Sequence, residues 1–211
     1  MAAEPFSHLV TSADELREEL YPEPSGLVWD KEIGVLDHHC RDFLARSPFA
    51  LLATSDVAGR CDVSPRGGPD GFVRVLDAGR VAFADLTGNR RLDSLRNILE
   101  NPQIGMLFVI PGLRETLRLN GRAYLTRDPE VLRACDVPGR TTDLAIGVVV
   151  RTAFVHCAKA LIRSRLWEPE SWPAPEALPS AAAMLREHAR VDATVEQVDA
   201  GLREGYAQRL W

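Results

Sequence analysis

The fold is decided by three stretches that follow one another along the chain: Ser64-Pro65-Arg66-Gly67-Gly68, Val81-Ala82-Phe83-Ala84-Asp85 and Gly88-Asn89-Arg90-Arg91. The first two are typical of neighbouring β-strands, each of which ends in a loop with amide or guanidinium donors. The third opens a short helix from Leu92 to Glu100, which ends at Asn101-Pro102. Donors that converge from strand ends and a helix start predict a site for an anionic ligand, most simply a phosphate.

Length and composition indicate one sizeable domain with a buried core. The chain has 211 residues, of which 45% are hydrophobic, and a formal net charge of −5. An acidic balance argues against a nucleic-acid groove, which needs a concentrated basic face. No apolar run approaches the roughly 20 residues of a membrane span, and Met1 to Pro5 lack a signal-peptide pattern. We therefore expect a cytoplasmic protein with no nucleic-acid or membrane partner.

The cysteines predict neither disulfides nor a metal site. Cys40, Cys61, Cys135 and Cys157 are scattered and form no Cys-x-x-Cys pair, so we expect reduced thiols packed as small apolar groups. His38-His39-Cys40 has no second cluster of ligands to complete a metal site.

Apolar runs and alternating patterns predict a mainly β, α+β protein. We expect strands over 49–54, 61–64, 72–76, 80–84, 104–110, 115–125 and 145–156. We expect helices over 12–20, 37–46, 92–100, 180–190 and 191–210. Because helices do not alternate with strands, a small barrel is favoured over a doubly wound sheet. The absence of a Gly-x-Gly-x-x-Gly or phosphate-loop motif agrees with this choice.

The order of strand, polar loop, strand, Asn-Arg-Arg, helix, Asn-Pro and strand resembles that of the FMN-binding split barrels of the pyridoxamine 5'-phosphate oxidase type. The resemblance covers roughly residues 47–172 and implies three parts. Residues 1–46 are an N-terminal helical extension, 47–172 the split barrel, and 173–211 a C-terminal helical tail that packs on the barrel or on a partner. It also implies a homodimer with FMN at the interface of the two barrels.

Carried onto this chain, the resemblance implies a cofactor site along the three opening stretches. Ser64, Arg66 and Gly67 would contact the flavin and its phosphate side, and Val81, Ala82, Phe83 and Asp85 would lie along the ring. Phosphate and ribityl oxygens would be bound by Asn89, Arg90 and Asn97. Physical chemistry supports this independently, because arginine and helix-terminal amides suit a phosphate. Arg66 as a solvated turn residue and Asn89 as a plain turn residue remain alternatives.

Two later segments are implied to complete the site. Arg118 and Asn120 share one face of a strand by the two-residue period and would reach the flavin across the dimer. Arg165 and Trp167 would close the site, with Trp167 against the flavin ring. An ordinary polar sheet face and a hydrophobic anchor for the proline-rich tail are the respective alternatives.

The chain departs from the vitamin oxidase itself, because nothing matches the Arg-Leu-His-x-Arg-like segment that holds the vitamin's phosphate. The resemblance is closer to a broad bacterial branch with Gly-Asn-Arg-Arg and Glu-Thr-Leu-Arg-Leu-Asn-Gly signatures. It implies an FMN-dependent oxidoreductase acting on a small molecule, and no catalytic residue is assigned because flavin carries the redox chemistry. The alternatives are a non-catalytic flavin- or haem-binding module, with His156 or Cys157 as axial ligand, and a deazaflavin (F420)-dependent reductase.

Overall fold

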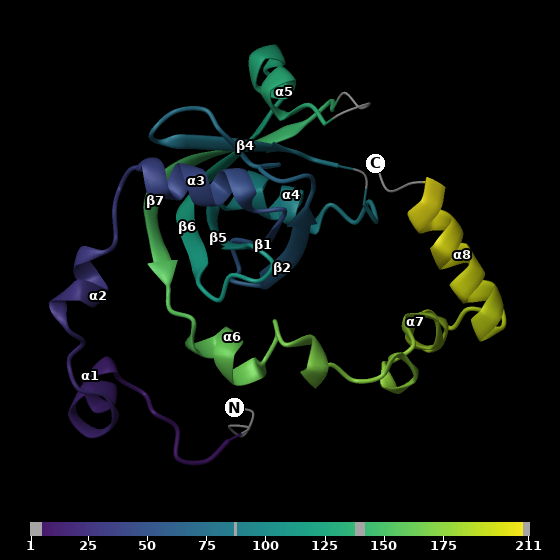
Figure 1. The fold of residues 1–211 in the computed structure, drawn as a ribbon, viewed down its shortest axis with the longest axis horizontal. Coiled ribbons are helices and arrows are strands. Elements are labelled where there is room, and N and C mark those ends of the chain that lie inside the picture. Colours follow the sequence, from purple (N-terminus) through teal and green to yellow (C-terminus); the bar gives the residue numbers. More distant parts are fainter. Residues whose placement is uncertain (1–5, 87, 138–141, 209–211) are drawn as a thin grey trace. The chain divides into compact units, whose positions relative to one another are not determined.

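The computed structural model describes residues 6–86, 88–137 and 142–208, and the chain divides into two compact units, one ending at Glu32 and the other beginning at Ile33 (Figure 1). The first unit contains three short helical segments: α1 (Ala13–Glu15), a π-helical turn (Leu16–Leu20) and α2 (Gly26–Asp30). The hydroxyl of Ser12 accepts a hydrogen bond from the Glu15 amide, which confirms the predicted helix start.

The second unit is built on a seven-stranded antiparallel sheet in the order β2-β1-β5-β6-β7-β4-β3, which forms a split barrel. The predicted mainly β, α+β fold is therefore confirmed. The strands are β1 (Phe49–Ser55), β2 (Cys61–Gly67), β3 (Arg74–Val75), β4 (Arg80–Ala84), β5 (Gln103–Val109), β6 (Thr116–Thr126) and β7 (Ala145–His156). The helices are α3 (His38–Arg46), α4 (Asp93–Glu100), α5 (Pro129–Cys135), α6 (Lys159–Ser164), α7 (Ala181–Ala189) and α8 (Val195–Gln208), with 3₁₀ turns at Pro169–Ser171 and Pro175–Ala177.

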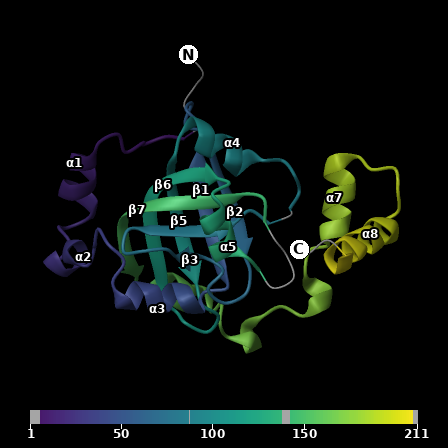
Figure 2. The ribbon, with the colours of Figure 1, turned by 90° about the horizontal axis from the view of Figure 1, so that it is seen from above.

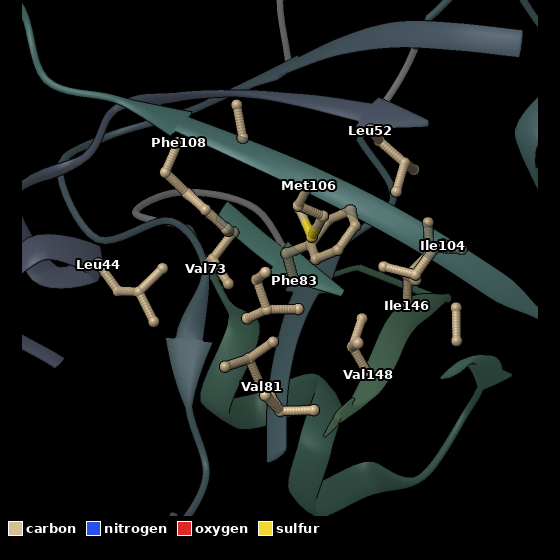
Figure 3. Packing of buried hydrophobic residues seen from close by; sticks show 14 of the residues in the cluster. Leu44, Leu52, Val73, Val81, Phe83, Ile104, Met106, Phe108, Ile146 and Val148 are labelled. Atoms are coloured by element: carbon tan, nitrogen blue, oxygen red, sulfur yellow. The ribbon is translucent and has the colours of Figure 1, made fainter. Parts of the chain in front are cut away.

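The interior of the barrel is filled by every second residue of its strands. Strand β1 buries Ala50 and Leu52, and β5 buries Ile104, Met106 and Phe108. This is the two-residue period expected of strands that present one face to a core. Figure 3 shows side chains from β4, β5 and β7 converging in this cluster: Phe83, Met106 and Ile146.

The longest pairing in the sheet joins β6 and β7 and is interrupted at one point. Their register shifts between Asn120 and Gly121, which marks a β-bulge, and bulges bend and twist strands. A Cβ atom at position 121 would lie 2.3 Å from the carbonyl oxygen of Val149. Glycine is therefore required there by the close approach of the two backbones.

Two helices cover different sides of the barrel, as Figure 2 shows for α3 and α4. The N-cap of helix α3 is Asp37, whose carboxylate accepts from the Cys40 amide at 2.8 Å, and that amide contact holds the pKa of Asp37 below its usual value. It buries Cys40 and Leu44 in the core, and burial raises the pKa of the Cys40 thiol to about 11.

Helix α4 is fixed to the sheet by apolar and polar contacts together. Leu95 and Ile98 enter the core. The Asn97 side chain donates to the Thr54 hydroxyl at 2.9 Å, and the Asn101 side chain donates to the Ser55 hydroxyl at 3.0 Å. Because these bonds reach β1, the direction of α4 against the sheet is set, and its first turn lies beside β2.

The structure differs from the predicted elements in several places, among them α2 and α6, where no helix was predicted. The strand expected over 72–76 is reduced to Arg74–Val75, because Phe72 and Val73 are buried in the loop before it. Helix α5 was not predicted, although an Asp128 cap followed by proline is a helix-start signal. The last helix begins at Val195 rather than 191, after reciprocal hydrogen bonds between Thr194 and Gln197.

The terminal helices α7 and α8 contact each other, but α8 buries no residue among those described. The domain boundaries at 46 and 172 stay predictions.

The four cysteines divide into two pairs by burial. Cys40 and Cys135 are buried, whereas Cys61 and Cys157 are exposed. The expectation that the thiols pack as small apolar groups therefore holds only for the first two. None of the helices in the described ranges has the length and apolar character needed to cross a membrane.

The close approach at Gly121 generates a prediction. Gly121→Ala should lower the free energy of unfolding by about 1–3 kcal/mol, because the added methyl group overpacks the bulge. Gly147→Ala on the same pair of strands is the matched control, since its Cβ would meet no atom closer than 3.9 Å. Urea denaturation of both variants checks this, and an equal effect of the two substitutions would contradict the role given to Gly121.

Candidate functional site

A cleft of about 630 Å³ opens between the end of β2, the segment after β4 and the first turn of α4. Its volume falls in the range of small-molecule sites. The cleft continues along Pro65, Arg66, Leu86 and Gly88 into a second hollow of about 600 Å³, lined also by Gly67, Phe83 and Ala84. The charged residues that line the first cleft are three arginines and three aspartates: Arg66, Arg90, Arg91, Asp62, Asp85 and Asp93.

Strand β2 presents a polar face to this cleft. Asp62, Ser64 and Arg66 alternate with the more exposed Val63 and Pro65, as the two-residue period of a strand requires. The polar face therefore turns toward α4, while the other face of β2 is apolar.

A chain of hydrogen bonds links this polar face to α4. The Ser94 hydroxyl donates to the Asp62 carboxylate at 2.9 Å, and it lies 3.0 Å from the Ser64 hydroxyl. The Nε of Arg66 donates to the Ser64 oxygen at 3.3 Å. Ser94 itself is buried, with 4% of its surface exposed, so the contacts are sheltered from water.

Arg66 is held on its other side by β4. Its Nη1 lies 3.1 Å from Oδ1 of Asp85, and the two side chains are 20% and 22% exposed. Asp85 directly follows β4, and its amide donates to the carbonyl oxygen of Leu144. The guanidinium group of Arg66 is thus fixed between β2 and β4, which were predicted as neighbouring strands but are not paired in the sheet.

The segment from Gly88 to Leu92 forms the opposite wall. The Asn89 side chain accepts from the Arg91 amide at 3.0 Å, which is an Asx-type turn. Arg90 and Leu92 have φ angles of 60° and 64°, in the left-handed region that non-glycine residues seldom adopt. This backbone separates the two neighbouring arginine side chains.

The two arginines of this wall have different partners. Nε of Arg91 lies 2.7 Å from Oδ2 of Asp93, and this hydrogen bond raises the pKa of the Arg91 guanidinium. Arg90 is exposed, and its guanidinium has no hydrogen bond or ion pair with another described residue. Among the arginines lining the cleft, Arg90 is therefore the one whose charge is uncompensated within the described part of the chain.

The first turn of α4 also faces the cleft without a cap. Its N-cap residue is Leu92, and no side chain accepts from the first amides, whereas α3, α5 and α7 begin with capping side chains: Asp37, Asp128 and Ser180. Uncapped amides at a helix start carry partial positive charge and can bind an anion.

The structure brings together seven of the predicted site residues around the two hollows and places the others elsewhere. The seven are Ser64, Arg66, Gly67, Phe83, Asp85, Asn89 and Arg90. Val81 and Ala82 are fully buried in hydrophobic clusters. Asn97 lines neither hollow, because its amide is bound to Thr54.

Arg118 and Asn120 lie on the outer face of β6, away from these hollows. Arg118 donates to the side chain of Asn120 at 3.3 Å and lies over the ring of Phe154, and Asn120 donates to Thr152. Arg118 lines an outer cavity of about 540 Å³, together with mostly apolar residues of β1, β2 and β5 and with His156 and Cys157.

Arg165 and Trp167 are engaged in local contacts. Arg165 pairs with Glu168 at 2.6 Å. The indole Nε1 of Trp167 donates to the carbonyl oxygen of Leu113 at 2.8 Å. Trp167 therefore anchors its segment to the loop between β5 and β6.

Among the cleft residues that sequence reasoning did not assign to the site, Asp62 and Ser94 matter most, because they hold Ser64. Asp62 had a usable signal, since the spacing of Asp62, Ser64 and Arg66 puts all three on one face of a strand. Ser94 had none beyond its place in a helix start, because its contacts depend on how α4 packs. No group of three or more His, Cys, Asp or Glu side chains within the described ranges is arranged to hold a metal ion.

The chain is similar to several proteins of known structure. No curated protein matches the chain. The solved structures it resembles include a putative pyridoxamine 5'-phosphate oxidase from Lactobacillus delbrueckii, with 17% identity over 58% of this chain and 99% of that chain and a TM-score of 0.45. HupZ from Group A Streptococcus has 21% identity over 57% and 93% of the two chains, with a TM-score of 0.46. HutZ, the haem storage protein from Vibrio cholerae, has 19% identity over 57% and 94%, with a TM-score of 0.40.

A family model described as pyridoxamine 5'-phosphate oxidase matches residues 36–142, which is just over half of the chain. The matched region runs from the residues before α3 past α5 and contains β2, β4 and α4, the three elements that build the cleft. The chain therefore belongs to the pyridoxamine 5'-phosphate oxidase family.

Proposed function

We propose that the protein is a cytoplasmic, FMN-dependent oxidoreductase that acts on a small molecule and holds the FMN phosphate in the cleft between β2, β4 and α4. The observation that carries the proposal is the arrangement of Arg66. Its guanidinium is fixed by Ser64 and Asp85 at the edge of a cleft. Family membership adds support, because the resemblance to these split barrels implies an FMN site.

The donors of the cleft fit a phosphate monoester. A phosphate carries nearly two negative charges and three acceptor oxygens. Arg66 and Arg90 offer guanidinium donors, and the uncapped first turn of α4 offers amides. Charge-assisted hydrogen bonds from arginine are among the strongest available for such a group.

When bound, flavin supplies the hydride and electron transfer, so the chain needs no nucleophile of its own. The residues of the chain bind the flavin and orient it and the substrate. The second hollow, lined by Phe83, Ala84 and the Gly67-Gly68 backbone, is a mostly apolar extension in which a ring could lie. We assign no general acid or base.

We propose further that two chains form a homodimer around the cofactor. Arg118 and Asn120 lie on a different face from the cleft in one chain, so a second copy is needed for them to reach the same flavin. The apolar residues of the outer cavity, among them Leu51, Val63 and Leu107, supply a surface that pairing would cover.

A second candidate, a non-catalytic haem-binding role, is favoured by one observation. His156 and Cys157, either of which can be a haem ligand, line the mostly apolar outer cavity. A Soret band in the visible spectrum of the purified protein, lost in His156→Ala, identifies this role. A colourless but redox-active preparation favours the deazaflavin instead.

FMN should stabilise the fold more than riboflavin does, because riboflavin lacks the phosphate. A ligand at a hundred times its dissociation constant stabilises the state that binds it by about 2.7 kcal/mol. For a chain of this length that is a rise in melting temperature of about 5–10 °C. Differential scanning fluorimetry with equal concentrations of FMN and riboflavin measures the two rises in melting temperature. Equal rises would contradict the proposed phosphate site.

Arg66→Ala and Arg90→Ala should each weaken FMN binding by about ten- to a hundredfold, because each removes a charge-assisted contact worth about 1.5–3 kcal/mol. Arg91→Ala is the matched control, since Arg91 is already paired with Asp93, and its affinity should stay near the wild-type value. Arg90→Lys should recover only part of the loss, because an ammonium group lacks the guanidinium fork.

The affinities follow from quenching of flavin fluorescence during titration of apo-protein. Loss of binding in Arg91→Ala together with normal binding in the other two alanine variants would show that the phosphate lies elsewhere.

A further inference from the structure

We infer that Asp62, Ser94 and Ser64 form a one-way hydrogen-bond relay that positions Arg66 for a phosphate, so that Ser64 acts through Arg66 rather than as a phosphate donor itself. The inference rests on the proposed function and deepens it. None of the three residues contacts the ligand in this account, and each is a positioning residue.

The direction of the relay follows from a count of hydrogens. A serine hydroxyl has one hydrogen to donate, and a carboxylate can only accept. The hydrogen of Ser94 is donated to Asp62, so the contact of 3.0 Å between the two hydroxyl groups must use the hydrogen of Ser64. The oxygen of Ser64 then has lone pairs left for Nε–H of Arg66.

This direction decides what Ser64 can do. Its hydrogen points toward Ser94 and away from Arg66. The Asp62 carboxylate maintains this direction, because it accepts the hydrogen of Ser94. A phosphate oxygen needs a donor, and Ser64 could serve as one only if its bond to Ser94 were broken. The hydroxyl therefore acts as a fixed acceptor for Arg66.

The same count shows what remains on Arg66. A guanidinium group has five N–H donors. Nε–H is bound to Ser64 and one hydrogen of Nη1 to Asp85, which leaves both hydrogens of Nη2 and one of Nη1. The two hydrogens of Nη2 lie on different edges of the planar group, and both can donate charge-assisted hydrogen bonds to phosphate oxygens. The relay thus holds Nε, Asp85 holds Nη1, and Nη2 is left free for the phosphate.

Loss of the relay should weaken binding of the phosphate specifically. Without Ser94 the Ser64 hydroxyl can rotate, and Arg66 must be immobilised when the ligand binds. Immobilising a flexible side chain costs about three- to tenfold in affinity. Riboflavin makes no phosphate contact, so its affinity should change little. The readout is the ratio of the dissociation constants of riboflavin and FMN, which a general loss of stability leaves unchanged.

The test compares Ser94→Ala with Ser55→Ala in the full-length protein. Both remove a hydroxyl that binds α4 to the sheet, but Ser55 contacts Asn101 at the far end of the helix, away from the cleft. Titrations with FMN and riboflavin should give a ratio lowered three- to tenfold for Ser94→Ala and a wild-type ratio for Ser55→Ala. Ser94→Thr, which keeps the hydroxyl, should have the wild-type ratio. If Ser94→Ala folds poorly, Asp62→Ala takes its place and should lower the ratio by the same factor.

Two results overturn the inference and are distinct from each other. If the wild-type protein does not discriminate FMN from riboflavin, the proposed function fails and the relay fails with it. If the wild type discriminates but Ser94→Ala and Asp62→Ala keep the wild-type ratio, the phosphate site stands and the relay alone is wrong.

Discussion

The cleft depends on the junction between α4 and β2, where the Ser94 hydroxyl joins Asp62 and Ser64. Helix α4 is a short element that lies on the sheet through Leu95 and Ile98, and apolar contacts alone are non-directional. Polar bonds from its side chains to β1 and β2 supply the direction. Because buried hydrogen bonds are costly to leave unmade, they fix the first turn of α4 beside the polar face of β2.

The electrostatics of the cleft are balanced rather than strongly positive. The three aspartates of the lining match the three arginines in number. Asp85 and Asp93 are ion-paired with Arg66 and Arg91, and Asp62 accepts from Ser94. This pairing holds guanidinium groups in place before a ligand arrives, which lowers the ordering cost of binding.

The strands and the main features of the cleft could be predicted because they are local in the sequence. Local periods and turn signals are present in three segments: the alternation along 61–67, the Gly88-Asn89-Arg90-Arg91 stretch and the apolar run of β5. What could not be predicted depends on packing between distant segments. The salt bridge of Arg66 with Asp85 and the contacts of Ser94 need β2, β4 and α4 to be assembled first.

The same distinction explains the residues that were placed away from the cleft. Asn97 shares a helix with Ser94 and is near it in sequence, yet it bonds to β1 rather than β2, because α4 lies over these two paired strands. Trp167 donates to Leu113, a contact across 54 positions that no local pattern reveals. Helix α5 is different, since its Asp-Pro start was readable and was overlooked.

The most direct measurement is a crystal structure of the protein in complex with FMN, in which the position of the phosphorus atom is seen. The account predicts the phosphate in the cleft between β2, β4 and α4, within hydrogen-bond distance of Nη2 of Arg66, with Ser64 and Asp85 still holding that side chain. A phosphate bound on the outer face beside Arg118, with Arg66 unchanged and unliganded, would contradict it.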